Sequence, residues 1–347
     1  MLVSISSDKT VKLWHLKGIK PPRLPINGSL GDISISPNGQ IIATVAADNT
    51  IKLWNLNGTL LKQIVDKISP FSKITFSPDG KYLVSSAQAL VQIWNIDSGE
   101  SKIIIKQELN KGKTNNFSKA SFSNDGKTIV VGREDGTVKL LRLDGAEPQT
   151  LQGGGKVVSY SPNGEIIASA SNNNTVKLWN ADGKELLSLL GSSYPITSFI
   201  FSPDSKTLVA GNANGNIIIW SITGKKLYTL QGHSSAVSSL TFRPDSKIFA
   251  SASGNGSSED SGTIKFWSVD GIDIKTFKTD SSSVSSINFS PNGKMLVWSN
   301  GGEVIMWNLD LDYLLSQGCD WVSDYLQNNS NVSASDRHLC DGISKQK

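Results

Sequence analysis

The sequence is poor in the residues that enzyme active sites and metal centres need. Its 347 residues include only three histidines and two cysteines, and His15, His233 and His338 are too scattered to suggest a catalytic triad or a metal site. No glycine-rich phosphate loop with its lysine is present either. We therefore expect a protein that is not an enzyme, with no catalytic residues, no metal and no cofactor.

Long apolar runs are missing as well. The longest are only a few residues, for example residues 103–105, whereas a membrane-spanning helix needs about 20. Residues 1–8 lack the basic region and the apolar run of a secretory signal. We expect no contact with a membrane and a cytoplasmic location.

Cysteine is too rare for a disulfide framework, and its count agrees with a reducing compartment. We predict that Cys319 and Cys340 are reduced thiols that pack as small apolar groups. Their separation also leaves open a disulfide in an oxidising compartment, and thiol titration distinguishes the two states.

Charge of one sign is not concentrated anywhere in the chain. The 34 basic and 30 acidic residues are spread along it and leave a net charge of +4. A nucleic-acid-binding surface normally shows a basic stripe interleaved with exposed aromatic residues, and no such run is found. We expect no specific nucleic acid as a partner.

What the sequence has in abundance is repetition. A phrase typified by Ser-Pro-Asp-Gly occurs seven times, at residues 34–39, 75–80, 121–126, 159–164, 200–205, 241–246 and 288–293. A second phrase, Thr-Val/Ile-Lys-Leu-Trp with its variants, occurs eight times and ends at Trp14, Trp54, Trp94, Leu141, Trp179, Trp220, Trp267 and Trp307. The period of about 42 residues is typical of four-stranded propeller blades.

Each phrase has a physical role. In Ser-Pro-Asp-Gly, proline presets one φ, aspartate bonds to the backbone and glycine accepts a positive φ, so the chain reverses. In residues 50–54 the side chains alternate between two faces and both faces carry apolar groups, which predicts a blade covered by a neighbour on each side. Short polar side chains stand six residues before the end of the second phrase, and we interpret them as turn residues that accept backbone N–H bonds: Asp8, Asp48, Asp135, Asn173 and Asn214.

These recurring phrases make residues 1–308 resemble the WD-repeat family, which implies an all-β propeller of four-stranded antiparallel blades. Members of the family often carry a hydrogen-bonded network of a Gly-His dipeptide, a strand Ser or Thr, a turn Asp and the Trp. Here only Gly232 and His233 keep the dipeptide, and Ser261 occupies the turn position of that repeat. We interpret His233 as a structural turn residue and expect apolar burial, more than polar networks, to hold the blades together.

The number of blades follows from how the ring closes. Seven complete repeats occupy residues 19–308, and residues 1–18 supply only two strands of an earlier repeat. Because an open ring would expose strand edges, we expect residues 20–26 to pair with residues 303–307 and to complete a seven-bladed β-propeller. Pro21, Pro22 and Pro25 weaken this strand, although an outer edge tolerates proline. Residues 1–18 would be a leftover hairpin, or alternatively a partial eighth blade.

After Trp307 the apolar spacing becomes helical, which predicts a short helical C-terminal tail over residues 309–347. One apolar face, from Leu311 to Leu315, ends at Gly318, and a second lies on residues 321–326. Residues 333–336 have the spacing of a capping box before a last short helix. The tail resembles the terminal segment of bacterial multi-repeat WD proteins, in which propellers often follow a signalling, protease-like or kinase module.

Together these features favour a non-catalytic protein–protein interaction scaffold, the sensor or partner-binding arm of a signalling protein. We expect a monomeric propeller, by itself or within a larger chain. The alternatives are a nucleic-acid-binding platform, which predicts steeply salt-dependent binding, and a propeller enzyme, which needs an acidic or histidine cluster facing the central channel.

We expect the protein or peptide partner on the face built by the loops that enter the innermost strands and by the turns bearing Asp48, Asp135 and Asn214. Two loops, residues 107–117 and 254–262, are longer than the repeat requires, and insertions commonly lie on a binding face. Aromatic and arginine side chains are frequent anchors of interfaces. The candidate contact residues are Phe71, Lys113, Phe117, Arg133, Tyr194 and Asn214.

Overall fold

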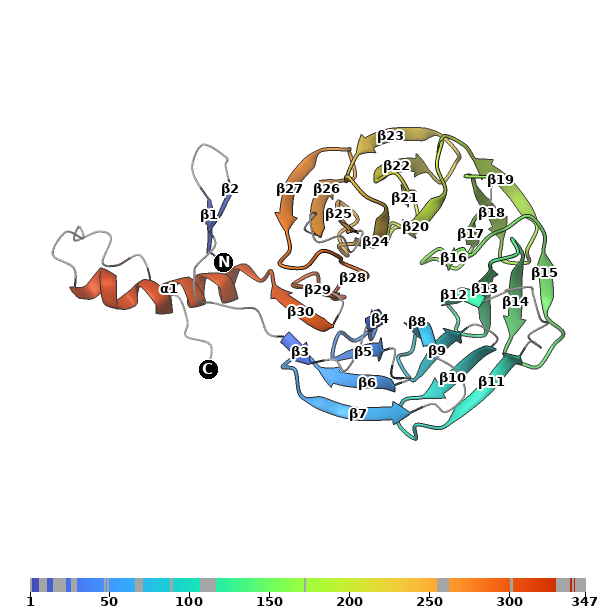
Figure 1. The fold of residues 1–347 in the computed structure, drawn as a ribbon, viewed down its shortest axis with the longest axis horizontal. Helices are drawn as coiled ribbons and strands as arrows, with labels where there is room; N and C mark the ends of the chain where they lie inside the picture. Colours follow the sequence, from blue (N-terminus) through green and yellow to red (C-terminus); the bar gives the residue numbers. More distant parts are fainter. Residues whose placement is uncertain are drawn as a thin grey trace.

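Seven four-stranded antiparallel sheets form a closed ring in the computed structural model of the chain (Figure 1). The structure describes residues 2–5, 11–14, 23–25, 30–46, 48, 50–65, 71–87, 90–106, 117–171, 173–254, 262–299, 302–328, 338 and 340. Strands follow one another within each sheet in the order of the sequence, except in the sheet that closes the ring. The expectation of an all-β, seven-bladed propeller is confirmed.

The blades are numbered from the N-terminus, and each is listed from its innermost to its outermost strand. Blade 1 contains β4 (Leu30–Ile35), β5 (Ile41–Ala46), β6 (Thr50–Asn55) and β7 (Leu60–Val65). Blade 2 contains β8 (Phe71–Phe76), β9 (Tyr82–Ala87), β10 (Leu90–Asn95) and β11 (Ser101–Lys106). Blade 3 contains β12 (Phe117–Phe122), β13 (Thr128–Arg133), β14 (Val138–Arg142) and β15 (Gln149–Leu151). Blade 4 contains β16 (Val157–Tyr160), β17 (Ile166–Ala170), β18 (Val176–Asn180) and β19 (Glu185–Leu189).

The remaining blades follow the same plan. Blade 5 contains β20 (Ile196–Phe201), β21 (Thr207–Asn212), β22 (Asn216–Ser221) and β23 (Lys226–Gln231). Blade 6 contains β24 (Val237–Phe242), β25 (Ile248–Ser253), β26 (Thr263–Ser268) and β27 (Asp273–Lys278). Blade 7 contains β28 (Ile287–Phe289), β29 (Met295–Ser299), β30 (Glu303–Asn308) and, from the start of the chain, β3 (Arg23–Pro25).

The ring closes between β3 and β30, as the sequence predicted. Leu24 pairs with Val304 in this antiparallel contact and is only 1% exposed. Arg23 adds an ion pair to Glu303, with 2.6 Å between Nη1 and Oε2. The closing strand is three residues long and ends at Pro25, in agreement with the inability of proline to extend a ladder.

The N-terminal hairpin lies outside this ring. Strands β1 (Leu2–Ile5) and β2 (Val11–Trp14) pair with each other, and among the described strands they pair with no blade. The hairpin contacts α1 (Leu311–Asn328) through β1, and Figure 1 shows it beside that helix. Seven blades, without a partial eighth, make up the described ring.

Apolar burial holds adjacent blades together. On one face of β6, Ile51 and Leu53 pack with Ile74 of blade 2. On the other face, Trp54 packs with Leu24 and other residues of blade 7. Both faces of the strand are therefore covered, as the alternating pattern predicted, and burying such side chains contributes about 25 cal/mol per Å² of apolar surface.

Buried polar contacts reinforce this packing to a degree that the sequence alone did not indicate. Tryptophan indoles donate from Nε1 to a Ser or Thr hydroxyl of the neighbouring strand in four blades, at 2.8–3.0 Å: Trp54 to Thr44, Trp94 to Ser85, Trp179 to Ser169 and Trp267 to Ser251. These bonds form in three blades that lack the Gly-His dipeptide. A strand hydroxyl therefore satisfies the buried indole by itself.

The Ser-Pro-Asp-Gly turns have the internal bonds that their composition predicts. In blade 2, Ser77 donates to Asp79 at 2.6 Å and accepts the backbone N–H of Tyr82 at 2.9 Å, and Gly80 has a φ of +72°. In blades 5 and 6 a serine takes the place of the glycine. Ser205 and Ser246 both have a φ of +59°, a conformation that normally favours glycine.

The tail begins with one continuous helix. Asp310 precedes α1 and accepts the backbone N–H of Tyr313 at 3.1 Å, which caps the helix. The two apolar faces that the sequence places before and after Gly318 belong to one helix, because α1 runs through this residue to Asn328. A helix-interior glycine costs only about 1 kcal/mol relative to alanine, and the turns on both sides continue past it. Residues 333–336 lie outside the described residues.

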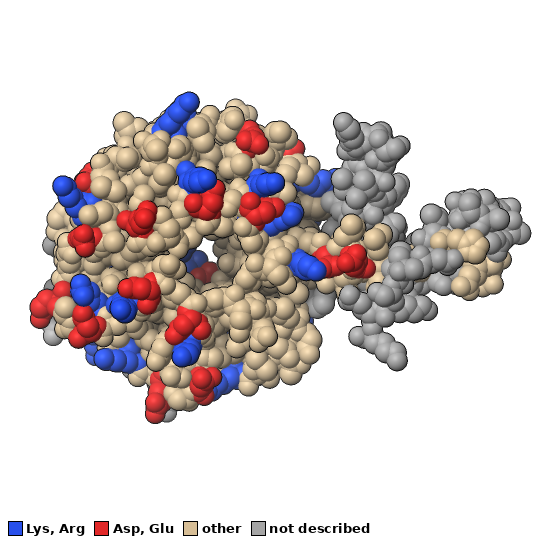
Figure 2. Space-filling model, turned by 180° about the vertical axis from the view of Figure 1, so that it is seen from behind, with Lys and Arg blue, Asp and Glu red and all other residues tan. Residues whose placement is uncertain are grey.

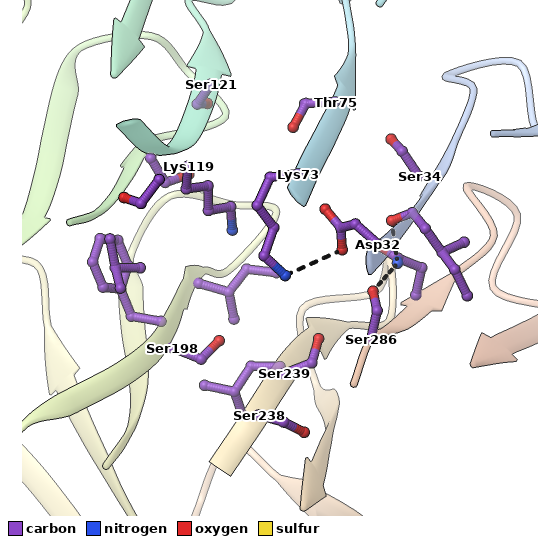
Figure 3. Close-up of a pocket in the computed structure, with 18 of the residues that line it drawn as sticks. Asp32, Ser34, Lys73, Thr75, Lys119, Ser121, Ser198, Ser238, Ser239 and Ser286 are labelled. Atoms are coloured by element: carbon purple, nitrogen blue, oxygen red, sulfur yellow. Dashed lines mark hydrogen bonds and ion pairs between the residues drawn. The ribbon is translucent and has the colours of Figure 1, made fainter. Parts of the chain in front are cut away.

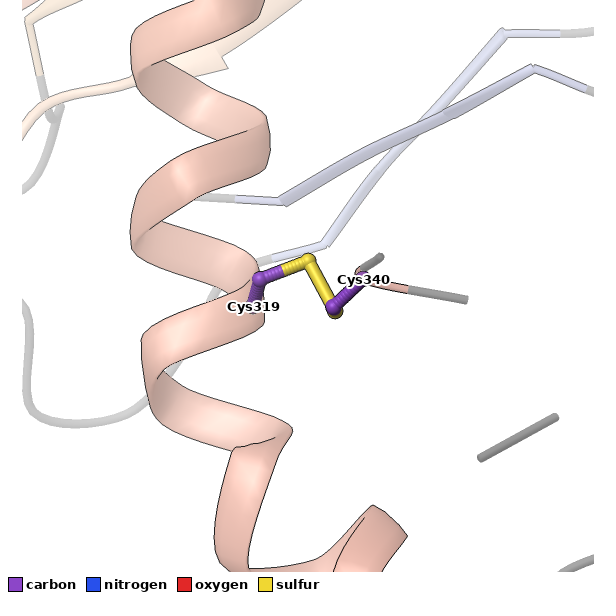
Figure 4. The surroundings of a disulfide bond; sticks show 2 residues. All are labelled: Cys319 and Cys340. Atoms are coloured by element: carbon purple, nitrogen blue, oxygen red, sulfur yellow. A yellow bond between two sulfur atoms is a disulfide. The ribbon is translucent and has the colours of Figure 1, made fainter. Parts of the chain in front are cut away.

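The prediction that Cys319 and Cys340 are reduced thiols is wrong, and the disulfide that the sequence left open forms instead. Cys319 of α1 and Cys340 form a disulfide, with 5.6 Å between their Cα atoms (Figure 4). Cys319 lies within α1, and the chain returns to it 21 residues later, which brings the two cysteines together. Cα atoms at this separation are in the range that a disulfide spans.

Within the described residues, no helix combines the length and the apolar character that a membrane crossing requires.

Candidate functional site

Two of the predicted contact residues, Phe117 and Arg133, lie inside blade 3. Phe117 is 3% exposed and belongs to the core between blades 2 and 3. The Arg133 side chain, 11% exposed, lies with its guanidinium carbon 5.6 Å from the centroid of the Phe117 ring. Its Nη1 atom is 3.1 Å from Asp135 Oδ2 and 3.3 Å from Thr137 Oγ1. Arg133 therefore braces a turn, and Phe117 supports it from below.

Asp135 is the centre of that braced turn. Its Oδ1 atom accepts the backbone N–H of Thr137 at 2.9 Å and the Thr137 hydroxyl at 2.6 Å. Partial burial acts to raise the pKa of Asp135, but the bonds from Thr137 and the charge of Arg133 lower it below its usual value. The carboxylate thus stays ionised and keeps the turn rigid.

Of two more candidates, Phe71 is described only in its backbone and Lys113 is not described. Phe71 starts β8 and pairs with Ala87, while its side chain falls outside the described part of the structure. Lys113, with almost all of the long loop 107–117, falls outside the described residues, as do residues 255–261 of the other long loop.

Tyr194 and Asn214 come together on blade 5. Tyr194 lies in the loop that enters β20 and is 45% exposed, and Leu190 at the start of this loop is 66% exposed. The loop is tied to the turn that bears Asn214, because Ala213 N–H donates to the Pro195 carbonyl at 2.9 Å and Asn212 Nδ2 donates to Ser192 Oγ at 3.3 Å. Blade 5 and the loop that enters it therefore present the exposed side chains of Leu190, Tyr194 and Asn214.

The prediction that the turn side chains accept backbone N–H bonds is confirmed for Asp48 and Asp135, whereas Asn173 accepts a hydroxyl instead. Asp8 lies outside the described residues. Asp48 accepts from Thr50, and Asn173 accepts the Thr175 hydroxyl at 2.6 Å. In blade 5 the acceptor is Asn212, whose Oδ1 atom receives the backbone N–H of Asn214 and of Asn216, both at 3.0 Å. Interpreting Asn214 as the acceptor is wrong, because the buried Asn212 at the end of β21 already satisfies both donors.

The central channel is lined by residues that the sequence interpretation did not name. Its wall consists of the innermost strands, and its cavity has a volume of about 380 Å³. Figure 2 shows an open hole at one face, surrounded by interspersed acidic and basic side chains. Seven residues form one level of this wall, and each stands two positions before the start of its six-residue repeat phrase: Asp32, Lys73, Lys119, Val157, Ser198, Ser239 and Ser286. This constant spacing is a signal from which the sequence could have located them.

The charged groups of the channel gather on neighbouring blades (Figure 3). Asp32 accepts the backbone N–H of Ile74 at 3.2 Å, and its other oxygen lies 3.6 Å from Lys73 Nζ. Burial lowers the pKa of Lys119, Asp32 partly offsets this, and the charge of Lys73 lowers it further. Lys156, in the loop that enters β16, also lines the cavity. Asp32 is the single carboxylate among the described lining residues.

Hydroxyl groups next to this level join one blade to the next. Thr197 donates to the Val237 carbonyl at 2.6 Å, Ser118 donates to the Lys156 carbonyl, and Ser238 donates to the Val284 carbonyl. Because these bonds connect consecutive innermost strands, they hold the channel wall in one shape.

His233 has the structural role that the sequence predicted. Its Nδ1 atom lies 2.6 Å from Thr263 Oγ1, and its Nε2 atom lies 2.7 Å from Ser251 Oγ, which also accepts from Trp267. Burial, with a contribution from the charge of Lys265, lowers the pKa of His233 to about 4. The imidazole is therefore neutral at pH 7. Ser261, the turn position of this repeat, lies outside the described residues.

Comparison with known families agrees with this architecture. The family model described as "IFT122 first beta-propeller" matches residues 32–259, and the model "WD domain, G-beta repeat" matches residues 271–308. The chain belongs to the WD-repeat propeller family.

Curated relatives of this WD-repeat propeller include two proteins from eukaryotes. It is 26% identical over 149 residues to Small ribosomal subunit protein RACK1y of Oryza sativa subsp. japonica. The matched region covers 42% of this chain and 44% of the relative. It is 32% identical over 72 residues to Target of rapamycin complex subunit wat1 of Schizosaccharomyces pombe. That matched region covers 21% of this chain and 22% of the relative. The chain spans less than half the length of each relative.

Proposed function

We propose that this WD-repeat propeller is a non-catalytic scaffold that binds a protein or peptide partner through the exposed patch on blade 5. The patch consists of Leu190, Tyr194 and Asn214. The observation that carries the proposal is that Leu190 and Tyr194 are 66% and 45% exposed, on a loop bonded to the turn of Asn214. Tyrosine is among the residues enriched at the centres of protein interfaces.

The names of the relatives support a role within an assembly, since one is called a small ribosomal subunit protein and the other a subunit of a complex. We further propose that the propeller is the partner-binding arm of a signalling protein and is monomeric by itself. The resemblance of its tail to bacterial multi-repeat proteins stays a prediction. We propose that Phe117 and Arg133 support the face from below, while Phe71 and Lys113 stay untested candidates.

A cytoplasmic location also stays a proposal. The Cys319–Cys340 disulfide favours an oxidising compartment instead, because disulfides are rare in reducing compartments. Alkylation of thiols in intact cells before lysis measures the state of both cysteines where the protein resides.

The test of the scaffold function uses a double variant, Leu190→Ser with Tyr194→Ala. Partners that purify with the wild-type protein are identified by mass spectrometry, and their affinity for each purified variant is then measured. The double variant should lose at least about 2 kcal/mol of binding free energy, because both anchors are removed. Leu61→Ser is the matched control, since Leu61 is 52% exposed but lies on the outer strand of blade 1. Equal affinities of the double variant and the wild type contradict the proposal.

A further inference from the structure

The central channel carries more positive than negative charge. Three lysines, Lys73, Lys119 and Lys156, line it together with one carboxylate, Asp32, among the described residues. The ion pair between Lys73 and Asp32 accounts for one ammonium group. In the described part of the chain, Lys119 and Lys156 have no carboxylate within 4.0 Å of Nζ. Lys119 and the exposed Lys156 therefore have no ion-pair partner in the described part of the chain.

An uncompensated ammonium group in a confined space is unfavourable, because part of its hydration is lost. The lowered pKa of Lys119 is the consequence of this burial together with the repulsion from Lys73. The wall that carries these groups is held by bonds between consecutive blades, which fix the backbone positions from which the lysine side chains extend. An anion in the channel would relieve both the desolvation and the repulsion.

Hydroxyl donors face the lysines across the channel. Figure 3 shows Ser198 and Ser239 on the side of the cavity opposite the Asp32, Lys73 and Lys119 strands. Ser239 accepts the backbone N–H of Ile287 at 3.2 Å, which leaves its own proton available for donation. The Ser198 hydroxyl has no protein partner among the described residues. Positive charge and hydroxyl donors around one cavity are the chemistry that binds phosphate oxygens.

We propose that the channel is a binding site for a phosphate monoester group, held by Lys73, Lys119 and Lys156 with hydroxyl groups of the opposite wall. A phosphate monoester carries a charge of about −1.5 to −2 at pH 7, which matches the excess of two positive charges, whereas a single carboxylate leaves one ammonium unpaired. Lys156 stands at the end of the channel where loops enter the innermost strands, and this is the entrance for the anion. The site does not depend on the patch of blade 5.

Isothermal titration calorimetry of the whole chain in a chloride-poor buffer tests the proposal. The ligands are inorganic phosphate, N-acetyl-phosphoserine amide and a phosphoserine peptide, with the unphosphorylated peptide as a control. Lys119→Gln should weaken the binding of each phosphate ligand at least about tenfold, because a charge-assisted contact is lost. Asp32→Asn should strengthen binding, since it frees Lys73 and keeps an acceptor for the Ile74 N–H. Lys184→Gln, at an exposed turn of blade 4, should change nothing.

The ligand arms separate the two sources of the phosphate group. Much tighter binding of the peptide indicates a phosphorylated side chain of a partner, and equal binding of inorganic phosphate indicates a small free anion. Circular dichroism melting confirms that each variant is folded, and Lys73→Gln replaces Lys119→Gln if that variant does not fold. The site is refuted if the wild type binds no phosphate ligand saturably, or if both glutamine variants bind as the wild type does.

Discussion

At the scale of single residues, the pairing of neighbouring strands places a hydroxyl acceptor next to a buried tryptophan N–H. Trp179 donates to Ser169 at 2.9 Å across the antiparallel pair of β17 and β18, and Ser169 is completely buried. A buried donor without an acceptor costs about 1–3 kcal/mol, which exceeds the net contribution of the bond when both partners are present. The serine is therefore more important for satisfying the indole than for its own packing.

Ser169→Ala should lower the free energy of unfolding by about 1–3 kcal/mol, because the indole N–H of Trp179 loses its acceptor. The same substitution in a Trp179→Phe background should cost much less, since no donor is left to satisfy. Urea denaturation of the four proteins of this double-mutant cycle measures the difference. A cost of Ser169→Ala that is the same in both backgrounds contradicts this role.

His233 makes the stability of blade 6 depend on pH. Its pKa is about 4 in the folded protein and about 6.5 in an unfolded chain, so the unfolded state binds more protons between these values. The contribution of the neutral imidazole is fully present above pH 6.5 and is lost as the pH falls from about 6.5 to about 4.

We expect the wild type to lose about 1–2 kcal/mol more stability than His233→Gln between pH 7 and pH 4.5, because glutamine does not titrate. Urea denaturation of both proteins over this range measures the difference. Parallel pH profiles would show that the imidazole does not couple to folding.

At the scale of elements, the loops and turns are as constrained as the strands. Gly155, in the loop that enters β16, lies so close to blade 4 that an added Cβ would stand 1.3 Å from the Ala170 carbonyl oxygen. The glycine is required by this approach of two backbones and not by a positive φ. Gly154 and Gly155 therefore serve packing at the channel entrance, whereas Gly153 has a positive φ of +71°.

Gly155→Ala should destabilise the protein by at least about 3 kcal/mol, because backbone atoms of β17 have to move to make room. Gly302→Ala is the matched control, since an added Cβ there has no atom within 4 Å. Thermal unfolding of both variants measures the effect. A melting temperature of Gly155→Ala equal to that of the control contradicts the close approach.

The tail is joined to itself by a covalent bond. Alkylation of the denatured, unreduced protein should find no free thiol, and two should appear after reduction, since the chain has two cysteines. Cys340→Ser should leave the melting of the ring nearly unchanged, because Cys319 and Cys340 lie outside the seven blades. Two free thiols before reduction would contradict the disulfide.

At the scale of the whole molecule, closure depends on a very short strand. Strand β3 covers the edge of β30, and Leu24 is buried among residues of blades 1 and 7. The hairpin of β1 and β2 pairs with no blade among the described strands. These two parts of the N-terminal segment should therefore differ strongly in their effect on stability.

Deletion of residues 1–18 should leave the melting temperature and the monomeric state nearly unchanged, because the ring keeps all of its described strands. Deletion of residues 1–26 should lower the melting temperature by at least about 5 °C and promote aggregation, because it removes the buried Leu24 and exposes the edge of β30. Calorimetry and light scattering of both variants test this. Severe destabilisation by the shorter deletion would show that the hairpin belongs to the ring.

The sequence by itself determined the architecture. Ser-Pro-Asp-Gly turns and Trp strands act through local conformation and through alternation of apolar side chains, so their period predicted four-stranded blades, and the need to cover a strand edge predicted the closure at residues 20–26. The sequence also predicted that Tyr194 and Asn214 lie on the same face, because loops alternate between the two faces of a propeller in a regular order.

Only the tertiary structure decided which side chains face one another across blades. Phe117 and Arg133 are turned into blade 3, Asn212 takes the role expected of Asn214, and Lys73 and Lys119 meet in the channel, 46 residues apart in the chain. The Cys319–Cys340 bond likewise depends on the return of the chain to α1, 21 residues after Cys319. Local sequence patterns specify the strands and turns, whereas these contacts arise from the closure of seven sheets into a ring and from the path of the chain after it.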